Sequence, residues 1–312
     1  MNSSIVTVTL NPAIDQTAAI SNFKAGEVNR VQWEQADPGG KGVNVASFLS
    51  DFGVAVTVSG FLGKENLNLF QTWFDRKSIP NRFVPIAGRT RTNIKIIDEV
   101  QDQVTDINFP GLAPTAAEVE ILDRIIDELA IDHDWFILAG SLPAQVDPSL
   151  YAKLTQRLKA QGKTVVLDAS GESFRQAIAA APYAIKPNLD ELQEGLGRSL
   201  TSKSEIVQAA RELLAKGISC IVVSMGAEGA LFVEPETALW ARPPRVEVIS
   251  TVGAGDAMVA GFVTGKLRNL PLADCARLAT AFSVGTLSQV GARLPPSAEV
   301  ESLLAQVTIE PM

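Results

Sequence analysis

The chain has 312 residues, of which 46% are hydrophobic and 20% charged, and its formal net charge is −8. This composition is typical of a soluble globular protein and argues against a basic surface for nucleic acid. A single histidine, His133, and two cysteines, Cys220 and Cys275, exclude a zinc cluster, a disulfide framework and any metal site with two imidazoles. Hydrolysis with a histidine base would depend on His133 alone.

No apolar run approaches the roughly 18 residues that are needed to span a bilayer. We therefore expect a cytoplasmic chain with no membrane partner and no nucleic-acid partner. His133 lies between two aspartates and away from every motif described below, so we expect a surface residue. The two cysteines lie in apolar segments and are expected in the core.

Apolar periodicity predicts strands that alternate with helices along the chain. Short apolar runs indicate buried strands, and caps such as Thr115 with Glu118, or glycines such as Gly53, mark the helix ends. In chain order we expect a strand at 5–10, a helix at 42–52, a strand at 54–61, helices at 67–76 and 115–129, a strand at 135–139, a helix at 147–162, strands at 164–168 and 183–186, helices at 189–196 and 206–216, strands at 220–224 and 246–249, and a helix that ends at 267. This order predicts an α/β fold whose mostly parallel central sheet is covered on both faces.

Two segments interrupt this alternation. Residues 15–35 and 91–109 alternate polar and apolar positions without a helix, and residues 92–96 and 104–108 resemble a hairpin that turns near Gln101 and Asp102. We expect one domain over residues 1–312, with these segments forming a small β-sheet beside the main one. Such a sheet would serve as a cover over an active site or as a dimer surface.

The clearest motif runs from Ser250 to Asp256. Gly253 and Gly255 leave successive amide N–H groups free at the start of a helix, and that arrangement binds anions. A carboxylate beside an anion site, here Asp256, could take a proton from a hydroxyl that attacks a bound phosphoryl group. The alternative is that Asp256 only caps the helix. The motif is neither a Walker A loop nor a Rossmann fingerprint, because Met258 replaces the third glycine of the latter.

Three further motifs stand at turns. Gly39, Gly40, Lys41 and Asn44 could hold a sugar with a phosphate, although a flexible loop with a solvated lysine is the alternative. Lys186, Asn188 and Glu191 follow a strand, where Asn188 and Glu191 could equally form a helix cap. The third motif, with Ser224, Gly226 and Gly229, is also consistent with an ordinary hairpin turn.

These motifs together resemble the PfkB, or ribokinase-like, carbohydrate kinases over essentially the whole chain. The matching stretches, in the family's order, are Asn11-Pro12-Ala13-Ile14-Asp15, Gly39-Gly40-Lys41-Gly42-x-Asn44, Gly140-Ser141-Leu142-Pro143, Lys186-Pro187-Asn188, Ser224-x-Gly226-x-x-Gly229 and Thr251-Val252-Gly253-Ala254-Gly255-Asp256. Residues 88–95 and 104–109 are most similar to the 1-phosphofructokinase group of the family. The resemblance implies a three-layer α/β/α domain with a small β-sheet lid.

The resemblance also implies a role for each matching residue. Asp256 would be the catalytic base, and the amides of Gly253, Ala254 and Gly255 would bind the transferred phosphoryl group. The sugar phosphate would be bound by Asp15, Gly39, Gly40, Lys41, Asn44, Arg91 and Ser141, with Arg30, Arg89 and Lys95 as further candidates for its phosphate. The nucleotide would be bound by Lys186, Asn188, Ser224, Gly226, Gly229 and Gly255, and Glu191 would hold Mg²⁺ through water.

The implied reaction is transfer of the γ-phosphoryl group of ATP to the C6 hydroxyl of fructose 1-phosphate. Tagatose 6-phosphate and fructose 6-phosphate are alternative substrates within the family, and a non-catalytic sugar-phosphate sensor is the alternative outside it. Mg²⁺ is expected as cofactor. K⁺ stays open, because Ser250 stands where ribokinases usually have an aspartate. A homodimer formed through the lid is expected.

Overall fold

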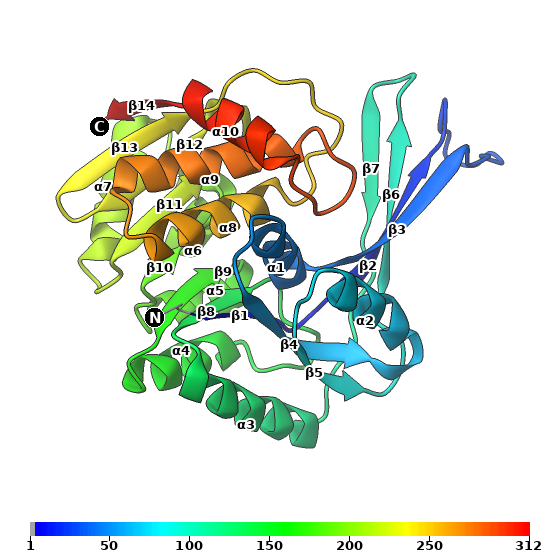
Figure 1. Cartoon of the computed structure of the whole chain (residues 1–312), viewed down its shortest axis with the longest axis horizontal. Helices are drawn as coiled ribbons and strands as arrows, with labels where there is room; N and C mark the ends of the chain where they lie inside the picture. The colour runs from blue at the N-terminus through cyan, green and yellow to red at the C-terminus, as the bar shows by residue number, and fades with distance from the viewer. Residues whose placement is uncertain (1–3) are drawn as a thin grey trace.

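The computed structural model describes residues 4–312, and among these ten strands form one large twisted sheet (Figure 1). Its strand order is β14-β13-β12-β11-β10-β9-β8-β1-β4-β5, and every neighbouring pair from β11 to β5 is parallel. The parallel strands are β1 (Ile5–Thr9), β4 (Val56–Gly63), β5 (Asn81–Ile86), β8 (Trp135–Ala139), β9 (Thr164–Asp168), β10 (Ala184–Ile185) and β11 (Cys220–Ser224). The antiparallel strands β12 (Ala230–Glu234), β13 (Thr237–Arg242) and β14 (Thr308–Pro311) extend one edge.

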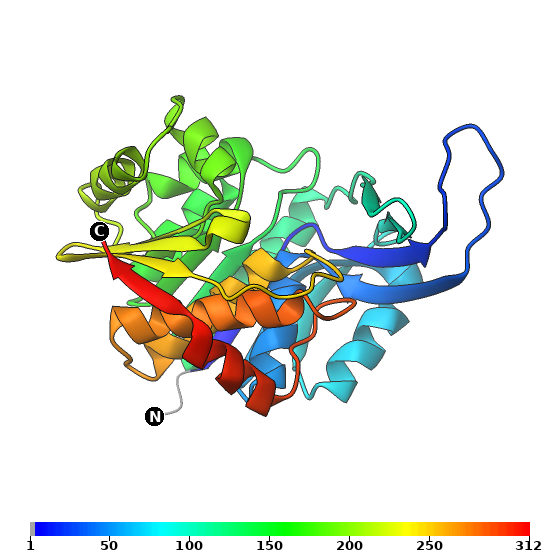
Figure 2. The same cartoon turned by 90° about the horizontal axis from the view of Figure 1, so that it is seen from above.

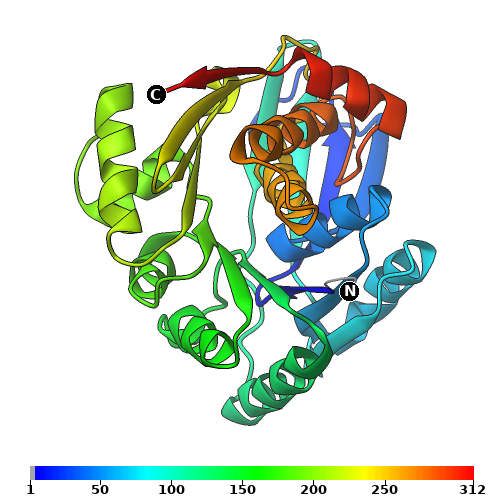
Figure 3. The same cartoon turned by 60° about the vertical axis from the view of Figure 1, so that its left-hand side comes forward.

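Helices cover both faces of this sheet, as the alternating pattern predicts (Figure 3). The helices over one face are α1 (Lys41–Asp51), α2 (Leu67–Arg76), α8 (Ala254–Leu267), α9 (Leu272–Thr286) and α10 (Ser297–Gln306). Those over the other face are α3 (Ala116–Asp132), α4 (Leu150–Ala160), α5 (Gly171–Ile178), α6 (Leu189–Leu196) and α7 (Lys203–Leu214). Strand residues alternate between the two cores, so that Ile5 packs under the first layer and Val6 under the second.

A second, four-stranded sheet projects from the edge of the large one, and we call it the lid (Figure 1). It consists of β3 (Trp33–Gly39), β2 (Ala13–Ala19), β6 (Thr92–Asp98) and β7 (Gln103–Ile107), in that order. The strands β6 and β7 form the expected hairpin, whose turn contains Asp102 in the left-handed region. The loop between β2 and β3 extends away from the rest of the molecule (Figure 2).

The predicted strand at 246–249 is wrong. These residues form no strand, and the side chains of Val248 and Ile249 are about half exposed, at 53% and 49%. The position beside β13 in the sheet is taken by β14, from the end of the chain, so residues 246–249 do not extend the sheet there. The amides of Ile249 and Ser250 instead donate to the carbonyl oxygen of Leu287.

The rest of the core follows the sequence pattern, with one difference at His133. Cys220 and Cys275 are buried and unpaired, as expected. His133 is half-buried rather than on the surface, because it ends α3 and its ring contacts the Leu129 carbonyl oxygen at 2.9 Å and Thr57 Oγ1 at 3.1 Å. Between residues 4 and 312 we find no helix long and apolar enough to cross a membrane.

Candidate active site

Two helix N-termini meet near the carboxyl ends of the parallel strands. The α8 helix brings Asp256 there and α1 brings Asn44, which donates from Nδ2 to Asp256 Oδ2 at 2.8 Å. Only 7% of Asp256 is exposed. The alternative that Asp256 merely caps its helix is wrong, because Gly253 occupies the N-cap position and Asp256 makes no capping hydrogen bond.

The turn before α8 has the geometry of an anion site. Gly253 has φ 77°, a left-handed conformation in which any other residue is strained. It is followed by Ala254 and Gly255 in the first turn, where amide N–H groups have no partner within the helix. A Cβ on Gly255 would lie 3.2 Å from Lys186 Nζ, so the missing side chain leaves room for that ammonium group beside the amides.

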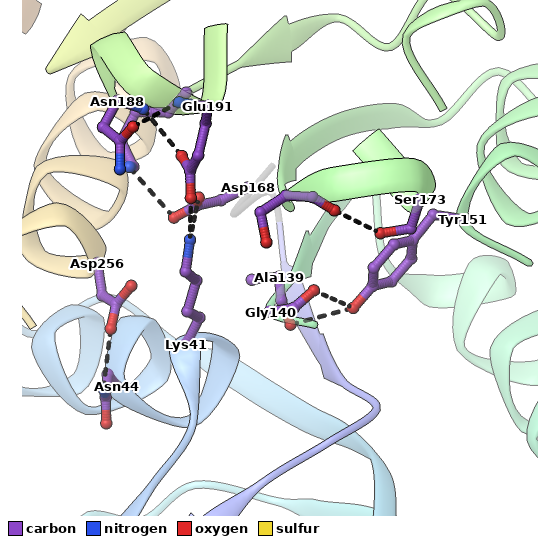
Figure 4. A network of polar contacts seen from close by, with 12 residues as sticks. Lys41, Asn44, Ala139, Gly140, Tyr151, Asp168, Ser173, Asn188, Glu191 and Asp256 are labelled. Carbon is purple, nitrogen blue, oxygen red and sulfur yellow. Dashed lines mark hydrogen bonds and ion pairs between the residues drawn. The ribbon is translucent and has the colours of Figure 1, made fainter. Parts of the chain in front are cut away.

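A cluster of charged side chains, of which Asp168 and Lys186 are buried, lies next to Asp256 (Figure 4). Lys41 Nζ is 2.8 Å from Asp168 Oδ1 and 3.6 Å from Glu191 Oε1. Lys186 Nζ is 3.4 Å from Asp168 Oδ2, and Asp168 itself is fully buried. The alternative of a solvated Lys41 in a flexible loop is therefore wrong, because the lysine starts α1 and is held by two carboxylates.

Burial and charge set the ionisation of this cluster. Burial, together with the negative charge of Asp168, raises the pKa of Asp256 to about 7, against the opposing effects of Lys41, Asn44 and Lys186. Burial alone would raise the pKa of Asp168, but Lys186 and Lys41 bring that pKa below its ordinary value. For Lys41, burial is outweighed by Asp168, Glu191 and Asp256, which raise its pKa. The site thus combines an ionised carboxylate, two ammonium groups and one carboxyl group that titrates near neutrality.

The motif at Asn188 is both a helix cap and part of this cluster. The backbone N–H of Asn188 donates to Glu191 Oε2 at 2.9 Å, and the backbone N–H of Glu191 donates to Asn188 Oδ1 at 2.7 Å. The two bonds form a complete capping box for α6. The same Glu191 presents its other oxygen to Lys41. The capping alternative is therefore correct and compatible with a second use of the side chain.

A cavity of about 540 Å³ opens beside the glycine turn. Its lining includes Gly226 and Gly229 from the turn between β11 and β12, and Thr251 and Ala254 from the turn before α8. Ser224 ends β11, and its amide donates to the Pro187 carbonyl oxygen at 3.1 Å. The hairpin-turn interpretation is right for residues 224–230, and this hairpin forms one wall of the cavity.

On the lid side, Asp15 lies against Gly39. A Cβ on Gly39 would come within 2.1 Å of Asp15 Oδ2, so only glycine permits this approach. The other oxygen of Asp15 accepts from Asn93 Nδ2 at 3.2 Å. Burial raises the pKa of Asp15, against the effect of that hydrogen bond. Gly39 leads directly through Gly40 to Lys41, which connects this carboxylate to the buried charges.

Arg91 and Ser141 lie where the lid joins the large sheet. The guanidinium group of Arg91 donates to the carbonyl oxygens of Asn11 at 3.0 Å, Pro12 at 3.2 Å and Phe109 at 2.9 Å. Ser141 Oγ accepts from Asn11 Nδ2 at 3.1 Å. Arg91 therefore connects the backbone segments at this junction, and three of its N–H donors are already used by carbonyl oxygens.

The other cationic candidates are not gathered into the buried cluster. Arg30 and Arg89 are exposed. Lys95 forms an ion pair with Asp106 across the lid hairpin, at 2.7 Å.

The buried carboxylates also fit a magnesium ion. Among residues 4–312, no three His, Cys, Asp or Glu side chains are grouped so as to hold a metal by themselves. Mg²⁺ usually keeps several waters and binds one or two carboxylates together with phosphate oxygens of a ligand. Glu191 and Asp168 can supply such carboxylates, and Asp168 Oδ2 is a buried oxygen that accepts no hydrogen bond and has only the ion pair with Lys186 Nζ at 3.4 Å.

Asp168 was missed by the sequence analysis. The sequence could have indicated Asp168, because it is the last residue of a predicted parallel strand. Ligand sites in α/β folds lie at the carboxyl ends of such strands. The residue that connects it to the candidate site, Lys41, is 127 residues away in the chain.

Comparison with known proteins agrees with this geometry. The model of the family described as pfkB family carbohydrate kinase matches residues 6–299. A protein named 1-phosphofructokinase from Rhodobacter capsulatus is 46% identical over 311 residues, covering 99% of this chain and 98% of the relative. A protein of the same name from Vibrio cholerae is 40% identical, and the match covers 99% of this chain and 97% of that relative.

Solved structures extend the likeness to the whole fold. A possible 1-phosphofructokinase from Thermotoga maritima superposes with a TM-score of 0.90 at 28% identity, covering 99% of both chains. Phosphofructokinase-2 from Escherichia coli, in complex with substrates and products, superposes with a TM-score of 0.90 at 27% identity. The match covers 97% of this chain and 98% of that one. The latter has also been solved with potassium and as a tetrameric inhibited form. The ribokinase-like three-layer fold with its small sheet is therefore confirmed.

Proposed function

Because the chain belongs to the pfkB family of carbohydrate kinases, we propose that it transfers the γ-phosphoryl group of ATP to the C6 hydroxyl of fructose 1-phosphate, giving fructose 1,6-bisphosphate and ADP. The observation that carries the proposal is Asp256, a buried carboxyl group with a pKa near neutrality beside the backbone amides of the first turn of α8. The choice of substrate is supported by relatives at 46% and 40% identity that bear the name 1-phosphofructokinase.

In this proposal Asp256 acts as general base. It takes the proton of the C6 hydroxyl while the sugar oxygen forms a bond to the γ-phosphorus, and the bond from that phosphorus to the bridging oxygen of ADP breaks. The amides of Gly253, Ala254 and Gly255 donate to the oxygens of the transferred group, on which negative charge is concentrated. Asn44 orients the base through its hydrogen bond of 2.8 Å.

The lysines have a separate electrostatic task. Lys186 lies beside Gly255 and is proposed to bind the phosphates of the nucleotide, while Asn188, Ser224, Gly226 and Gly229 position the rest of it near the cavity. Mg²⁺ would be held by Glu191 and Asp168, directly or through water, and supplies positive charge to the phosphate oxygens when bound.

For the sugar we propose Asp15, Gly39, Gly40, Lys41, Asn44 and Ser141 as hydroxyl partners. Lys41 would also share the C1 phosphate with Arg91, whose fork of donors suits that group. Because Arg91 already serves three carbonyl oxygens, phosphate binding would have to use its remaining N–H groups or replace one of these bonds.

A homodimer formed through the lid accompanies this proposal. The lid strand β7 is an exposed sheet edge, and Val104, Ile107 and Phe109 are 53%, 41% and 44% exposed there. The unpaired cysteines suit the reducing cytoplasm. K⁺ as an activating ion is proposed only on the likeness to the protein solved with potassium.

The experiment that tests the substrate compares kcat/KM for fructose 1-phosphate, fructose 6-phosphate and tagatose 6-phosphate under identical conditions. We expect the highest value for fructose 1-phosphate. A clear preference for either 6-phosphate would replace the substrate and leave the kinase chemistry in place. Binding without turnover of all three would favour the sensor alternative.

A further inference from the structure

The loop of residues 287–293, between α9 and α10, touches two parts of the molecule that bind different ligands in the proposed function. At one end, the carbonyl oxygen of Leu287 accepts hydrogen bonds from the amides of Ile249 at 2.8 Å and Ser250 at 3.1 Å. Ser250 opens the glycine turn before α8. Near its other end, the carbonyl oxygen of Ala292 accepts from Ser47 Oγ on α1 at 2.7 Å, in a buried bond. The loop therefore supports the backbone from which the anion site is built.

At its other end the same loop holds the lid. Arg293 Nη2 donates to Asp37 Oδ1 of lid strand β3 at 2.6 Å, across 256 residues of sequence. Asp37 is only 6% exposed, and a Cβ on Gly291 would come within 2.4 Å of Asp37 Oδ2. The guanidinium group of Arg293 also stacks over Trp73 of α2, with 5.0 Å between its central carbon and the ring centroid. The arginine thus has a fixed orientation, and the loop backbone lies directly against the lid carboxylate.

Asp37 is two residues before Gly39, which touches Asp15 on the sugar side. A ligand that fixes Asp15 and Gly39 therefore fixes Asp37 and, through Arg293, the loop that supports Ser250. The ordering of one side lowers the cost of ordering the other, which makes the two binding events cooperative. Asp37 suits this role because its carboxylate is buried and would lose its cation if the two partners separated, although the Arg293 side chain is 34% exposed.

We infer that Arg293 and Asp37 form a latch between the lid and the anion-binding turn, through which sugar phosphate and ATP strengthen each other's binding. Both are positioning residues, which act through the loop rather than by touching the reacting atoms. The inference rests on the proposed function for the identity of the two ligands.

The test measures the coupling directly. The Kd of the non-hydrolysable analogue AMP-PNP with Mg²⁺ is determined by calorimetry with and without saturating fructose 1-phosphate, for the full chain and its variants. In the parent protein we expect the sugar phosphate to tighten nucleotide binding by about fivefold or more, the lower end of ordinary allosteric coupling. In Arg293→Met and Asp37→Asn we expect a ratio within about twofold of one. The double variant should resemble the single ones, because both remove one interaction.

Matched variants separate the latch from general loss of stability. Arg82→Met removes an arginine from an ion pair with Glu128, on the opposite face of the sheet from Arg293, and should keep the full coupling. Arg293→Lys retains the charge and should restore part of it. The latch would be overturned if the parent protein bound both ligands without coupling between them, or if Arg293→Met kept the coupling of the parent protein. Parent protein that fails to bind fructose 1-phosphate would overturn the proposed substrate and the latch with it.

Discussion

Replacing Asn44 by alanine should move the acid limb of the pH profile to higher pH. Asn44 donates to Asp256 at 2.8 Å, and this bond stabilises the ionised form of a carboxylate whose pKa is raised to about 7 by burial and by Asp168. A general base works only when deprotonated, so log kcat/KM should fall with unit slope below the pKa of Asp256. Loss of a donor that favours the ionised form must raise that pKa.

The size of the change follows from the strength of the bond. A hydrogen bond to a charged group contributes about 1.5–3 kcal/mol, and about 1.4 kcal/mol corresponds to one pH unit, so the limb should move up by about one to two units. The ionised fraction of Asp256 at pH 7 would fall from about one half to about one tenth or less. Asn44→Ala also loses a proposed sugar contact, which lowers the whole curve without moving its inflection.

The assay is kcat/KM for the sugar phosphate between about pH 5.5 and 9.5, with Mg²⁺ and ATP saturating. The phosphates of the substrates also titrate in this range, but their contribution is the same for both proteins, so the difference between the curves reports on the enzyme. Ser47→Ala is the matched control, because Ser47 is one turn further along α1 and bonds Ala292 instead of Asp256. Coincident acid limbs for the parent protein and Asn44→Ala would refute the argument.

Three further changes test other parts of the site. Asp256→Asn should lower kcat by about a hundredfold or more while fructose 1-phosphate affinity by calorimetry changes little, and near-normal turnover would contradict the proposed base. Gly253→Ala should lower both kcat and Tm. Gly162→Ala is its control and should lower Tm alone, because Gly162 has nearly the same φ (73°, compared with 77° at Gly253) and a Cβ there would meet no other atom within 4 Å. Asp168→Asn should lower Tm at pH 7 because Lys186 loses its carboxylate partner and Lys41 loses one of its two. The folded-state pKa of Asp168 is depressed, so this difference should be present above about pH 4 and disappear as the pH falls further. A Tm difference that persisted in acid would exclude the ion pairs as its cause.

The parts that could be predicted from the sequence depend on local signals. The capping box of Thr115 and Glu118 lies within one helical turn and forms as predicted, and that of Asn188 and Glu191, which the sequence left as an alternative, forms as well. The glycine turn at Gly253 is likewise local, since its left-handed backbone and the following helix need only neighbouring residues. The strands were predictable because burial on both faces makes them continuous apolar runs.

The parts that could not be predicted depend on partners far away in the chain. Asp168 becomes part of the site through Lys41, and Asp37 becomes buried through Arg293, at separations of 127 and 256 residues. Residues 246–249 have the pattern of a strand, but the position beside β13 is taken by β14, from the end of the chain. Nothing within a short window of sequence carries that information.

Asp168 also explains how a base can be kept near neutrality beside two lysines. An ammonium group free to pair with Asp256 would lower the pKa of that carboxyl group and make it a weak base. Lys41 and Lys186 are instead held at 2.8 and 3.4 Å from Asp168, whose own charge raises the pKa of Asp256. When the phosphates of ATP enter, they would offer Lys186 a second anionic partner besides Asp168. The strength of the base therefore depends first on its burial and then on a carboxylate that need not touch the substrate.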